Sequence, residues 1–506
     1  MVLCLSLMVI MVANGSLNVA LPQMAEDLHA SSSQLQWMVD AYSLVFAGML
    51  FTAGTIGDRF GRKLVLQAGM LLFLLGSVVA SMANTSGQVI ALRAVMGFAA
   101  AFVMPSTLSL LTNVFEPHER PKAISIWAGI AAGGAALGPP ISGFLVEHFW
   151  WGSVFLINVP LLAVAIVAGR ILLPESRDPE QHRIDVPGAV LSILAIGALV
   201  YAIIEAPEEG WGSAHTLISF TIAAVALLAF VVRERTAEDP MFDLQLLHNP
   251  RFSISSVGIA LCFFAMFGVA FMATQYLQMV LGFTPFHAGL IMLPLPLILM
   301  LLAPQAPKFV HRFGIATMVP IGMGLIATGL LVFSTLGTTS HGWQIYFAIA
   351  PMMVGMAITM SPFTALIMTS VPPERAGMGS AMNDTTRELG GALGVAVLGS
   401  IVTTHYRSEM APTVATLPAE AGEQVASGLA GALQAATSLP ADVAGSVVEQ
   451  ARQAFTDGMG IAAVVGASVV IVVATIATML LRRMGTEPAQ RAILAMESPE
   501  ADTVLP

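Results

Sequence analysis

The stretch Gly54-Thr55-Ile56-Gly57-Asp58-Arg59-Phe60-Gly61-Arg62-Lys63 joins two long apolar runs, residues 36–56 and 64–82. Its glycines permit a tight turn in which two helices approach closely. Asp58 can accept hydrogen bonds from the N-terminus of a facing helix or pair with a base such as Arg120. A simple membrane anchor would explain Arg62 and Lys63 but not Asp58 and the glycines. We therefore expect a gate at this turn, whose contacts hold one side of the molecule closed and break when it opens.

Composition places both runs in a membrane protein. The chain has 506 residues, of which 56% are hydrophobic and 10% charged, and its mean hydropathy is +0.81. Soluble domains are about a quarter charged, so a soluble enzyme, a disordered chain and a nucleic-acid binder are excluded. Apolar runs of about 20 residues, enough for a helix to cross a bilayer, recur along the chain. They predict an all-α polytopic membrane protein.

Reading the apolar runs between polar or Gly/Pro breaks predicts fourteen membrane-spanning helices. The first lacks a basic region before it and a small-residue cleavage site after it, so we expect no cleaved signal peptide. The predicted spans are residues 2–21, 36–56, 64–82, 88–111, 122–146, 153–173, 186–205, 215–232, 252–275, 288–307, 316–335, 343–369, 378–402 and 458–481.

The basic residues give an independent check, because cytoplasmic loops collect Lys and Arg. With fourteen spans, nearly all of the 21 Lys and Arg residues fall on even-numbered connections or the C-terminal tail. Arg407 and Arg452 fall on the opposite side, and Arg93 and Arg387 fall within spans. We therefore expect a multi-pass protein of the cell membrane with both termini cytoplasmic. Residues 403–457 then form a long outer loop, either with one or two amphipathic helices in its Ala-rich part or as a solvated cap without a role in transport.

The two halves of the chain also resemble each other. Three matches recur in order at an offset of 253 to 257 residues: Arg59-Phe60-Gly61 with Arg312-Phe313-Gly314, Glu119-Arg120 with Glu374-Arg375, and the Gly-Ala run 133–138 with 390–394. They predict two six-span bundles, an architecture in which rocking halves give alternating access. The predicted parts are 1–180 for the first bundle, 181–240 for two inserted spans, 241–485 for the second bundle and 486–506 for a cytoplasmic tail.

Spans 4 and 5 carry residues that are unusual inside a membrane. Arg93 is costly there unless it faces a wet cavity or a carboxylate, the alternative being that it reaches toward the outer surface. In span 5, Gly129 is followed by Gly138-Pro139-Pro140-Ile141-Ser142-Gly143. Small residues let helices approach closely and prolines bend a helix, although ordinary packing would also use small residues.

These motifs resemble those of a known family. The turn at 54–63 closely matches the signature loop of the major facilitator superfamily. Arg93 to Gly97 resembles its span-4 arginine motif with Met96 in place of glutamine, and Gly129 to Gly143 resembles its antiporter motif with Ser142 in place of a second glycine. Stretches similar to its fourteen-span drug:proton antiporters are Asn18–Pro22, Gln36–Leu44, Trp150–Trp151, Phe155–Pro160 and Asn383–Gly391. The resemblance covers nearly the whole chain and implies export of hydrophobic, often cationic, compounds in exchange for protons.

Proton coupling needs a titratable group inside the membrane, and few are present. Asp384 and Glu388 are four residues apart on one face of span 13, with Arg387 beside that face. At 1.5 Å per residue, Glu388 lies roughly 15 to 20 Å from the cytoplasmic end, near the midplane. We rank Glu388 first, Asp40 second and Asp384 third, and include Arg93 and Arg387 in the proton-coupling set. The alternative for span 13 is a static buried ion pair.

The walls of a substrate pocket are expected among adaptable and aromatic side chains, which suit organic cations. The candidates are Trp127 on span 5 and Phe263, Phe267, Phe271 and Tyr276 on span 9. The alternative is that such residues face lipid or pack helices.

Many relatives have an aspartate in span 1 where this chain has Ala13-Asn14-Gly15-Ser16. Its loss would weaken a preference for divalent cations or change the proton stoichiometry.

We therefore expect a monomeric secondary active transporter of small hydrophobic or cationic substrates and protons, working in the lipid bilayer without a cofactor, metal or nucleic acid. The sequence contains no G-x-x-x-x-G-K-[ST] run, which disfavours an ATP-driven pump. An exporter of a native metabolite, lipid or antibiotic, proton-coupled or facilitative, is the nearest alternative. A membrane enzyme or sensor would need a polar catalytic cluster or an appended domain.

Overall fold

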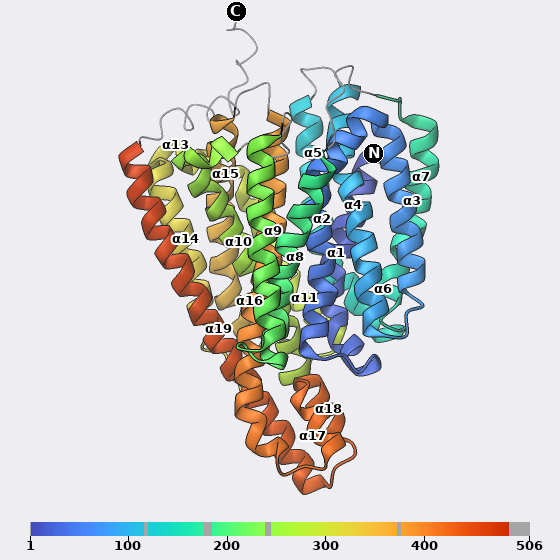
Figure 1. Cartoon of the computed structure of the whole chain (residues 1–506), viewed down its shortest axis with the longest axis vertical. Coiled ribbons are helices and arrows are strands. Elements are labelled where there is room, and N and C mark those ends of the chain that lie inside the picture. Colours follow the sequence, from blue (N-terminus) through green and yellow to red (C-terminus); the bar gives the residue numbers. More distant parts are fainter. Residues whose placement is uncertain (1, 116–119, 177–184, 238–243, 372–375, 485–506) are drawn as a thin grey trace, which may run out of the picture.

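The structure, a computed structural model, describes residues 2–115, 120–176, 185–237, 244–371 and 376–484. Over these ranges the chain forms helices and turns without a strand, arranged as one elongated bundle (Figure 1). The first helices are α1 (Val2–Asp27), α2 (Ser32–Phe60), α3 (Arg62–Ala80), α4 (Ser86–Val114), α5 (Arg120–His148), α6 (Ser153–Leu156), α7 (Asn158–Leu172), α8 (Val186–Glu209) and α9 (Ala214–Thr236). They are followed by α10 (Pro250–Gln275), α11 (Pro285–Met292), α12 (Pro294–Leu302), α13 (Ala306–Phe313), α14 (Ile315–Phe333), α15 (Ile345–Ser370), α16 (Ala376–Val414), α17 (Ala419–Ala426), α18 (Leu429–Ala436) and α19 (Ala441–Met484).

The long apolar helices make this a multi-pass membrane protein, as the composition predicts. Among the described residues, twelve helical segments are long and apolar enough to cross a membrane. Helices α2 and α5, of 29 residues each, run beside them in the same bundle. The count of fourteen spans therefore stays a prediction.

Three predicted spans contain a break or a wider turn in the structure. The span predicted at 153–173 is divided at Ile157 into α6 and α7, and the span predicted at 288–307 is divided at Leu293 into α11 and α12. Pro294 begins α12, and a proline lacks the backbone N–H that would continue the preceding helix. Helix α10 continues past Gln275 through one wider turn, Tyr276–Val280.

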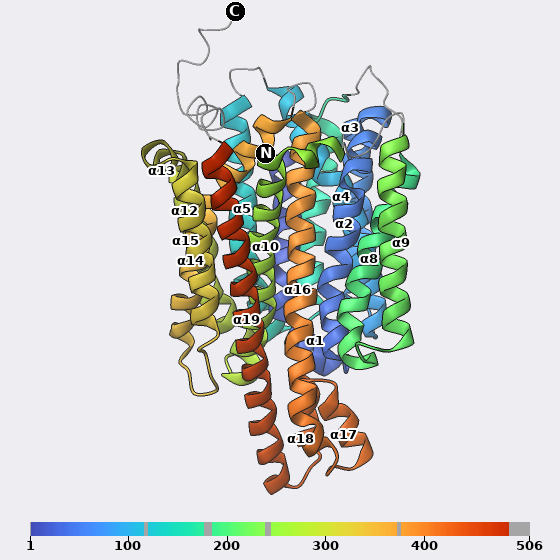
Figure 2. The same ribbon diagram turned by 60° about the vertical axis from the view of Figure 1, so that its left-hand side comes forward.

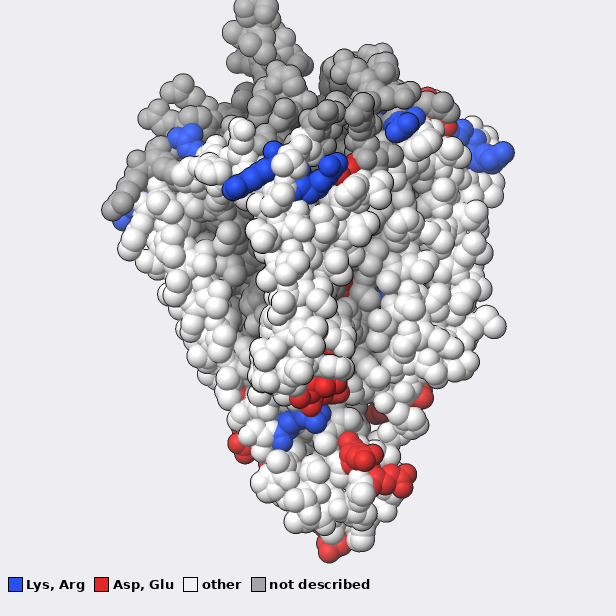
Figure 3. Space-filling model, in the orientation of Figure 1, with Lys and Arg blue, Asp and Glu red and all other residues white. Residues whose placement is uncertain are grey.

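The two ends of the bundle differ in charge and shape (Figure 3). Lys and Arg gather at one end, which we call the basic end; α3 begins there and α9 ends there with Arg233 and Arg235 in its last turn. At the opposite end, α16 and α19 project beyond the other helices and carry α17 and α18 between them (Figure 2). We call this end the cap end. The region predicted as a long outer loop, with one or two amphipathic helices in its Ala-rich part as one alternative, is largely helical: α16 reaches Val414, α17 and α18 follow, and α19 begins at Ala441.

Helix packing brings the parts of the site together. We call α1–α7 the N-terminal helices and α10–α19 the C-terminal helices. Within the first set α1 packs on α5, α2 on α4 and α3 on α7; within the second α10 packs on α16 and α14 on α15 and α19. The two sets meet where α2 lies against α16 and α5 against α11, and α8 lies against both α2 and α16. Glycines allow the close approaches, as at Gly390, where an added methyl group would overlap the Ala260 carbonyl.

Candidate functional site

Arg93 of α4 is held inside the bundle instead of reaching the surface. Its side chain is 1% exposed, and its Nε donates a hydrogen bond to the Met38 carbonyl at 2.9 Å. The guanidinium lies over the Tyr42 ring, 4.3 Å from the centroid. Its Nη1 and Nη2 and the Tyr42 hydroxyl are buried without a hydrogen-bond partner among the described residues. A buried cation with free donors facing α2 can attract a carboxylate or a polar substrate group.

Glu388 of α16 meets α2 across the boundary between the two sets of helices. The Ser43 hydroxyl of α2 donates a hydrogen bond to its carboxylate, and Arg93 lies close enough to act on it electrostatically. The other carboxylate oxygen, Oε2, is buried and has no partner within the described part of the chain. Glu388 is thus the acid at which α2, α4 and α16 converge.

Asp384 and Arg387 form an ion pair beside Glu388 on α16. Arg387 Nη1 lies 3.5 Å from Asp384 Oδ1, and the two side chains are 31% and 22% exposed. Arg387 also lies over the Phe263 ring of α10, 5.5 Å from its centroid. The alternative for span 13 is a buried ion pair that includes Glu388; the observed pair is partly exposed and joins Asp384 to Arg387, and Glu388 faces α2. An aromatic ring beside a partly exposed charge pair is a surface on which an organic ion can bind.

Asp40 of α2 is a buried acid in the middle of the bundle. It is 0% exposed, and neither carboxylate oxygen has a hydrogen-bond partner among the residues described. A buried ionised carboxyl without partners is very costly, so Asp40 is protonated or contacts water. One turn away, Gln36 is also 0% exposed and both polar atoms of its amide are unpartnered in the described structure.

The turn at 54–63 is observed as the junction between α2 and α3. Gly61 has φ 114°, a backbone conformation that favours glycine. Arg62 and Lys63 bind the end of α7: Arg62 donates to the Ser176 hydroxyl at 3.2 Å, and Lys63 Nζ donates to the Leu173 carbonyl at 2.6 Å. Other members of the predicted gate contribute less: Arg59 is exposed over Phe60, and Gly54 has open space around it. The side chains of Asp58 and Arg120 lie outside the described residues, so the predicted contact between them stays a prediction.

Helix α5 packs with one face on α1, in its own set of helices, and with the other face on α11, in the opposite set. Gly138 faces α1, where Ser16 and Ser142 are reciprocally bonded: Ser142 donates to the Ser16 carbonyl at 2.6 Å and Ser16 donates to the Gly138 carbonyl at 3.3 Å. Pro139 and Gly143 face α11. A methyl group added at Gly143 would lie 2.7 Å from Phe286 Cα, and one added at Gly289 would lie 2.5 Å from the Pro139 carbonyl oxygen. The surroundings of Gly129 lie outside the described residues.

The predicted substrate-binding residues do not form one cluster. Phe263 and Phe267 are neighbours with tilted rings, whose centroids are 6.0 Å apart, and Arg387 lies over the Phe263 ring. Phe271 lines a small cavity at the cap end, and the Tyr276 hydroxyl donates to the Gly337 carbonyl at 2.8 Å. Trp127 donates from Nε1 to Thr107 of α4 at 3.3 Å. Only the first pair lies with the charged residues of α16.

Two residues of the site, Tyr42 and Ser43, are not among the candidates predicted from the sequence. Tyr42 binds Arg93, and Ser43 binds Glu388. A signal was present in the sequence, since buried polar residues at positions 33, 36, 40 and 43 repeat at helical spacing along an otherwise apolar span.

Known proteins match the chain along most of its length. The family model described as Major Facilitator Superfamily matches residues 3–395. The multidrug efflux pump LfrA of Mycolicibacterium smegmatis is 35% identical over 95% of both chains. The tetracenomycin C resistance and export protein of Streptomyces glaucescens is 34% identical, covering 96% of this chain and 91% of its own. The methyl viologen resistance protein SmvA of Salmonella typhimurium is 33% identical, covering 87% of this chain and 89% of its own.

Solved structures agree on the fold. A bacterial homologue of the human lysosomal transporter Spinster, in an inward-facing and unoccupied conformation, superposes with a TM-score of 0.65 at 16% identity and covers 98% of both chains. A peptide transporter of the POT family superposes with a TM-score of 0.64 at 15% identity, covering 95% of this chain and 94% of its own. The helical bundle, the sequence match and these relatives together place the chain in the major facilitator superfamily, as a transporter and not an enzyme.

Proposed function

We propose that this protein exports small hydrophobic or cationic compounds, drugs and toxic compounds among them, in exchange for protons. The N-terminal helices form one bundle and most of the C-terminal helices the other, with α8 and α9 inserted between them. The basic end faces the cytoplasm, which puts both termini inside the cell and the cap end outside. The multidrug and resistance proteins to which the chain is similar support the substrate class.

The observation that carries proton coupling is the position of Glu388. Its carboxylate accepts a hydrogen bond from Ser43 on the opposite set of helices, lies near Arg93, and keeps one oxygen free. A proton on Glu388 removes the negative charge that holds Ser43 and Arg93 close, so protonation loosens the α2–α16 boundary. Asp384, Arg387 and Arg93 adjust the charge of the site, and Asp40 is a second proton carrier.

Contacts between the two sets of helices support alternating access as the mechanism. Toward the cap end the two sets of helices are tightly packed, with Gly143 and Gly289 at the α5–α11 crossing and Gln36 against Gly399 between α2 and α16. Substrate then enters from the basic end, where the turn at 54–63 forms the gate, and leaves at the cap end when these crossings separate. Phe263 and Phe267 beside Arg387 form part of the substrate surface.

A second candidate function is export of an antibiotic or other metabolite made by the cell itself. It is favoured by the similarity to the tetracenomycin C resistance and export protein. The sequence Ala13-Asn14-Gly15-Ser16 supports substrates other than dications, because it places no carboxylate in α1 at this depth. The two candidates share the transport mechanism and differ in the physiological substrate.

The test is transport in proteoliposomes driven by an imposed pH gradient, with ethidium as a fluorescent monocation. Proton-coupled export predicts ethidium movement against its gradient that stops when an uncoupler removes the pH gradient. Glu388→Gln abolishes the driven movement, whereas Glu449→Gln, which changes an exposed acid on α19, leaves it unchanged. Movement that is indifferent to the pH gradient would overturn antiport and leave a facilitator.

A further inference from the structure

A row of buried polar residues runs along α2 from the cap end to Glu388. Ser33, Gln36, Asp40 and Ser43 are 2%, 0%, 0% and 5% exposed. Their spacing of three, four and three residues places them on one face of the helix. At 1.5 Å per residue the row is about 15 Å long, roughly half of the hydrocarbon thickness. We call these four residues the α2 polar row.

Both ends of the row bind carboxylates. At the cap end the Ser33 hydroxyl donates to Glu208 Oε1 of α8 at 2.9 Å, and Glu205 of the same helix accepts from Trp37 Nε1 at 2.9 Å. At the inner end Ser43 donates to Glu388 of α16. Glu209 lies one residue beyond Glu208 on α8. The row therefore connects acids near the outer boundary with the acid proposed to carry the proton.

The middle of the row contains the unsatisfied groups. Both carboxylate oxygens of Asp40 and both polar atoms of the Gln36 amide are buried without a partner among the described residues. Buried polar atoms in native proteins are almost always hydrogen-bonded, to ordered water where no protein group is near. Four such atoms one helical turn apart indicate water within the α2–α16 boundary.

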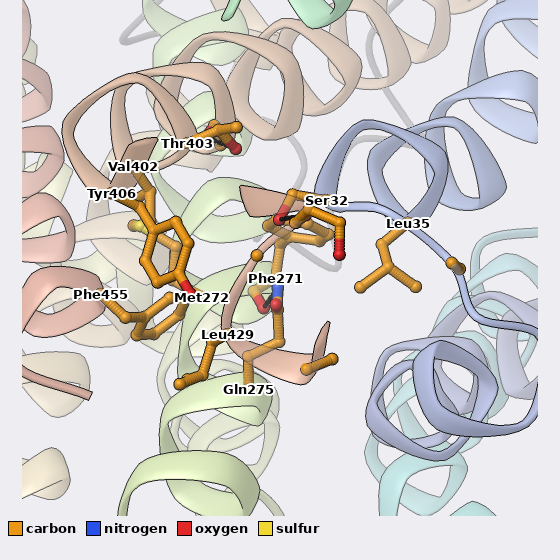
Figure 4. Close-up of a pocket in the computed structure, with 15 residues that line it drawn as sticks. Ser32, Leu35, Phe271, Met272, Gln275, Val402, Thr403, Tyr406, Leu429 and Phe455 are labelled. Carbon is orange, nitrogen blue, oxygen red and sulfur yellow. Dashed lines mark hydrogen bonds between the residues drawn. The ribbon is translucent and has the colours of Figure 1, made fainter. Parts of the chain in front are cut away.

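A small cavity lies where such water would enter (Figure 4). It holds about 20 Å³. Its lining includes Ser32 and Leu35 in the first turn of α2, Thr403 and Tyr406 of α16, and Gln275 of α10. That volume is enough for one water molecule. Gly399 of α16 also lines it, and the Gln36 side chain packs directly on Gly399, where an added methyl group would lie 2.7 Å from Gln36 Cδ.

We propose that the α2 polar row is the route by which protons pass between the cap side and Glu388. A proton arriving from the Glu205 and Glu208 side is passed through water held by Gln36 to the Asp40 carboxylate, and from Asp40 through Ser43 to Glu388. Each transfer leaves the donor deprotonated and the acceptor protonated, so only a proton moves. Asp40 is the carrier on this route and Gln36 is a positioning residue. This inference rests on the proposed proton antiport.

The test separates proton movement from substrate movement in proteoliposomes, with ethidium as the probe. Driven uptake requires proton transfer, whereas exchange of internal for external ethidium without a pH gradient does not. We expect Asp40→Asn, which removes a proton-transfer group, to slow driven uptake by about 100-fold. Gln36→Leu, which removes the amide that holds the water, should also slow driven uptake, while ethidium exchange stays within about twofold of wild type in both variants. Asp40→Glu keeps the carboxyl and restores driven uptake.

The matched control is Gln67→Leu on α3, which removes a partly buried amide whose Nε2 is also unpartnered in the described structure. It should leave both rates unchanged. Retention of driven uptake by Asp40→Asn and Gln36→Leu would overturn the route while leaving antiport intact. Equal loss of driven uptake and exchange would show a structural role and also overturn it. A wild-type protein that exchanges ethidium but shows no driven uptake would overturn the proposed antiport, and the route with it.

Discussion

The α5–α11 crossing predicts how a single methyl group changes the conformational equilibrium. In Gly143→Ala the new carbon would overlap the Pro285 carbonyl oxygen and lie 2.7 Å from Phe286 Cα, both backbone atoms of the opposite set of helices. Backbone cannot turn aside as a flexible side chain can, so the crossing must widen. Inserting a methyl group into tight packing costs about 1 to 3 kcal/mol. Because this cost falls on the cap-closed state alone, the equilibrium should shift about 5- to 150-fold toward a cap-open state.

The assay is a distance measurement by electron spin resonance between labels at His148 on α5 and His287 on α11, which are both exposed. Labelling can use introduced cysteines, since the native Cys4 and Cys262 are buried. Wild type should give mainly the short distance of the closed crossing, and Gly143→Ala should add a population at longer distance.

The control is Gly134→Ala on the same helix. Its added methyl group would lie 3.0 Å from the Met8 carbonyl oxygen of α1, so it strains a contact inside the N-terminal helices. It should lower thermal stability without lengthening the label distance. An unchanged distance in Gly143→Ala, or an equal change in Gly134→Ala, would refute the assignment of this crossing to the closing of the cap end.

Three further predictions concern single contacts. Tyr42→Phe should not lower the thermal unfolding temperature, because the hydroxyl has no partner among the described residues. Tyr42→Leu should lower the free energy of unfolding by about 2 kcal/mol, because it removes the ring beneath Arg93. Lys63→Met should destabilise the protein by about 1 kcal/mol in chemical unfolding, because Lys63 binds terminal carbonyls of α7; no effect would contradict this. A Cβ atom added at Gly428 would lie 3.6 Å from Ser32 Cβ, so paired cysteines at these two positions should form a disulfide that stops ethidium transport until a reductant is added. Gly428→Cys alone is the control for the backbone at φ 139°. Continued transport by the oxidised protein would show that α2 and the cap do not separate.

Much of the fold could be predicted from the sequence because a bilayer constrains it strongly. Apolar length alone predicts membrane helices, and the need for φ near 114° at Gly61 explains why the turn between α2 and α3 carries a glycine there. Arg93 was predicted as functional because a cation inside a membrane needs a partner. The structure supplies one in the Tyr42 ring and the Met38 carbonyl.

Other features depend on which helices meet, and periodicity does not specify that. Phe263, Phe267 and Phe271 share one face of α10, yet Arg387 lies over Phe263, whereas Phe271 lines the cap-end cavity two turns further along the helix. Tyr276 follows at the start of the wide turn, which rotates it toward Gly337. The extension of α16 and α19 into the cap was not predicted, because their Ala-rich segments are too polar to resemble membrane spans.

Proton release on ligand binding, measured without transport, shows directly whether Glu388 couples substrate to protons. Tetraphenylphosphonium is added to the purified protein in weakly buffered detergent solution containing a pH dye. Our account predicts that wild type releases protons as the cation binds, and that Glu388→Gln binds the cation without releasing any. Equal proton release from wild type and Glu388→Gln would contradict the assignment of Glu388 as the coupling acid. Binding by wild type without proton release, across the pH range in which the protein is folded, would contradict proton coupling itself.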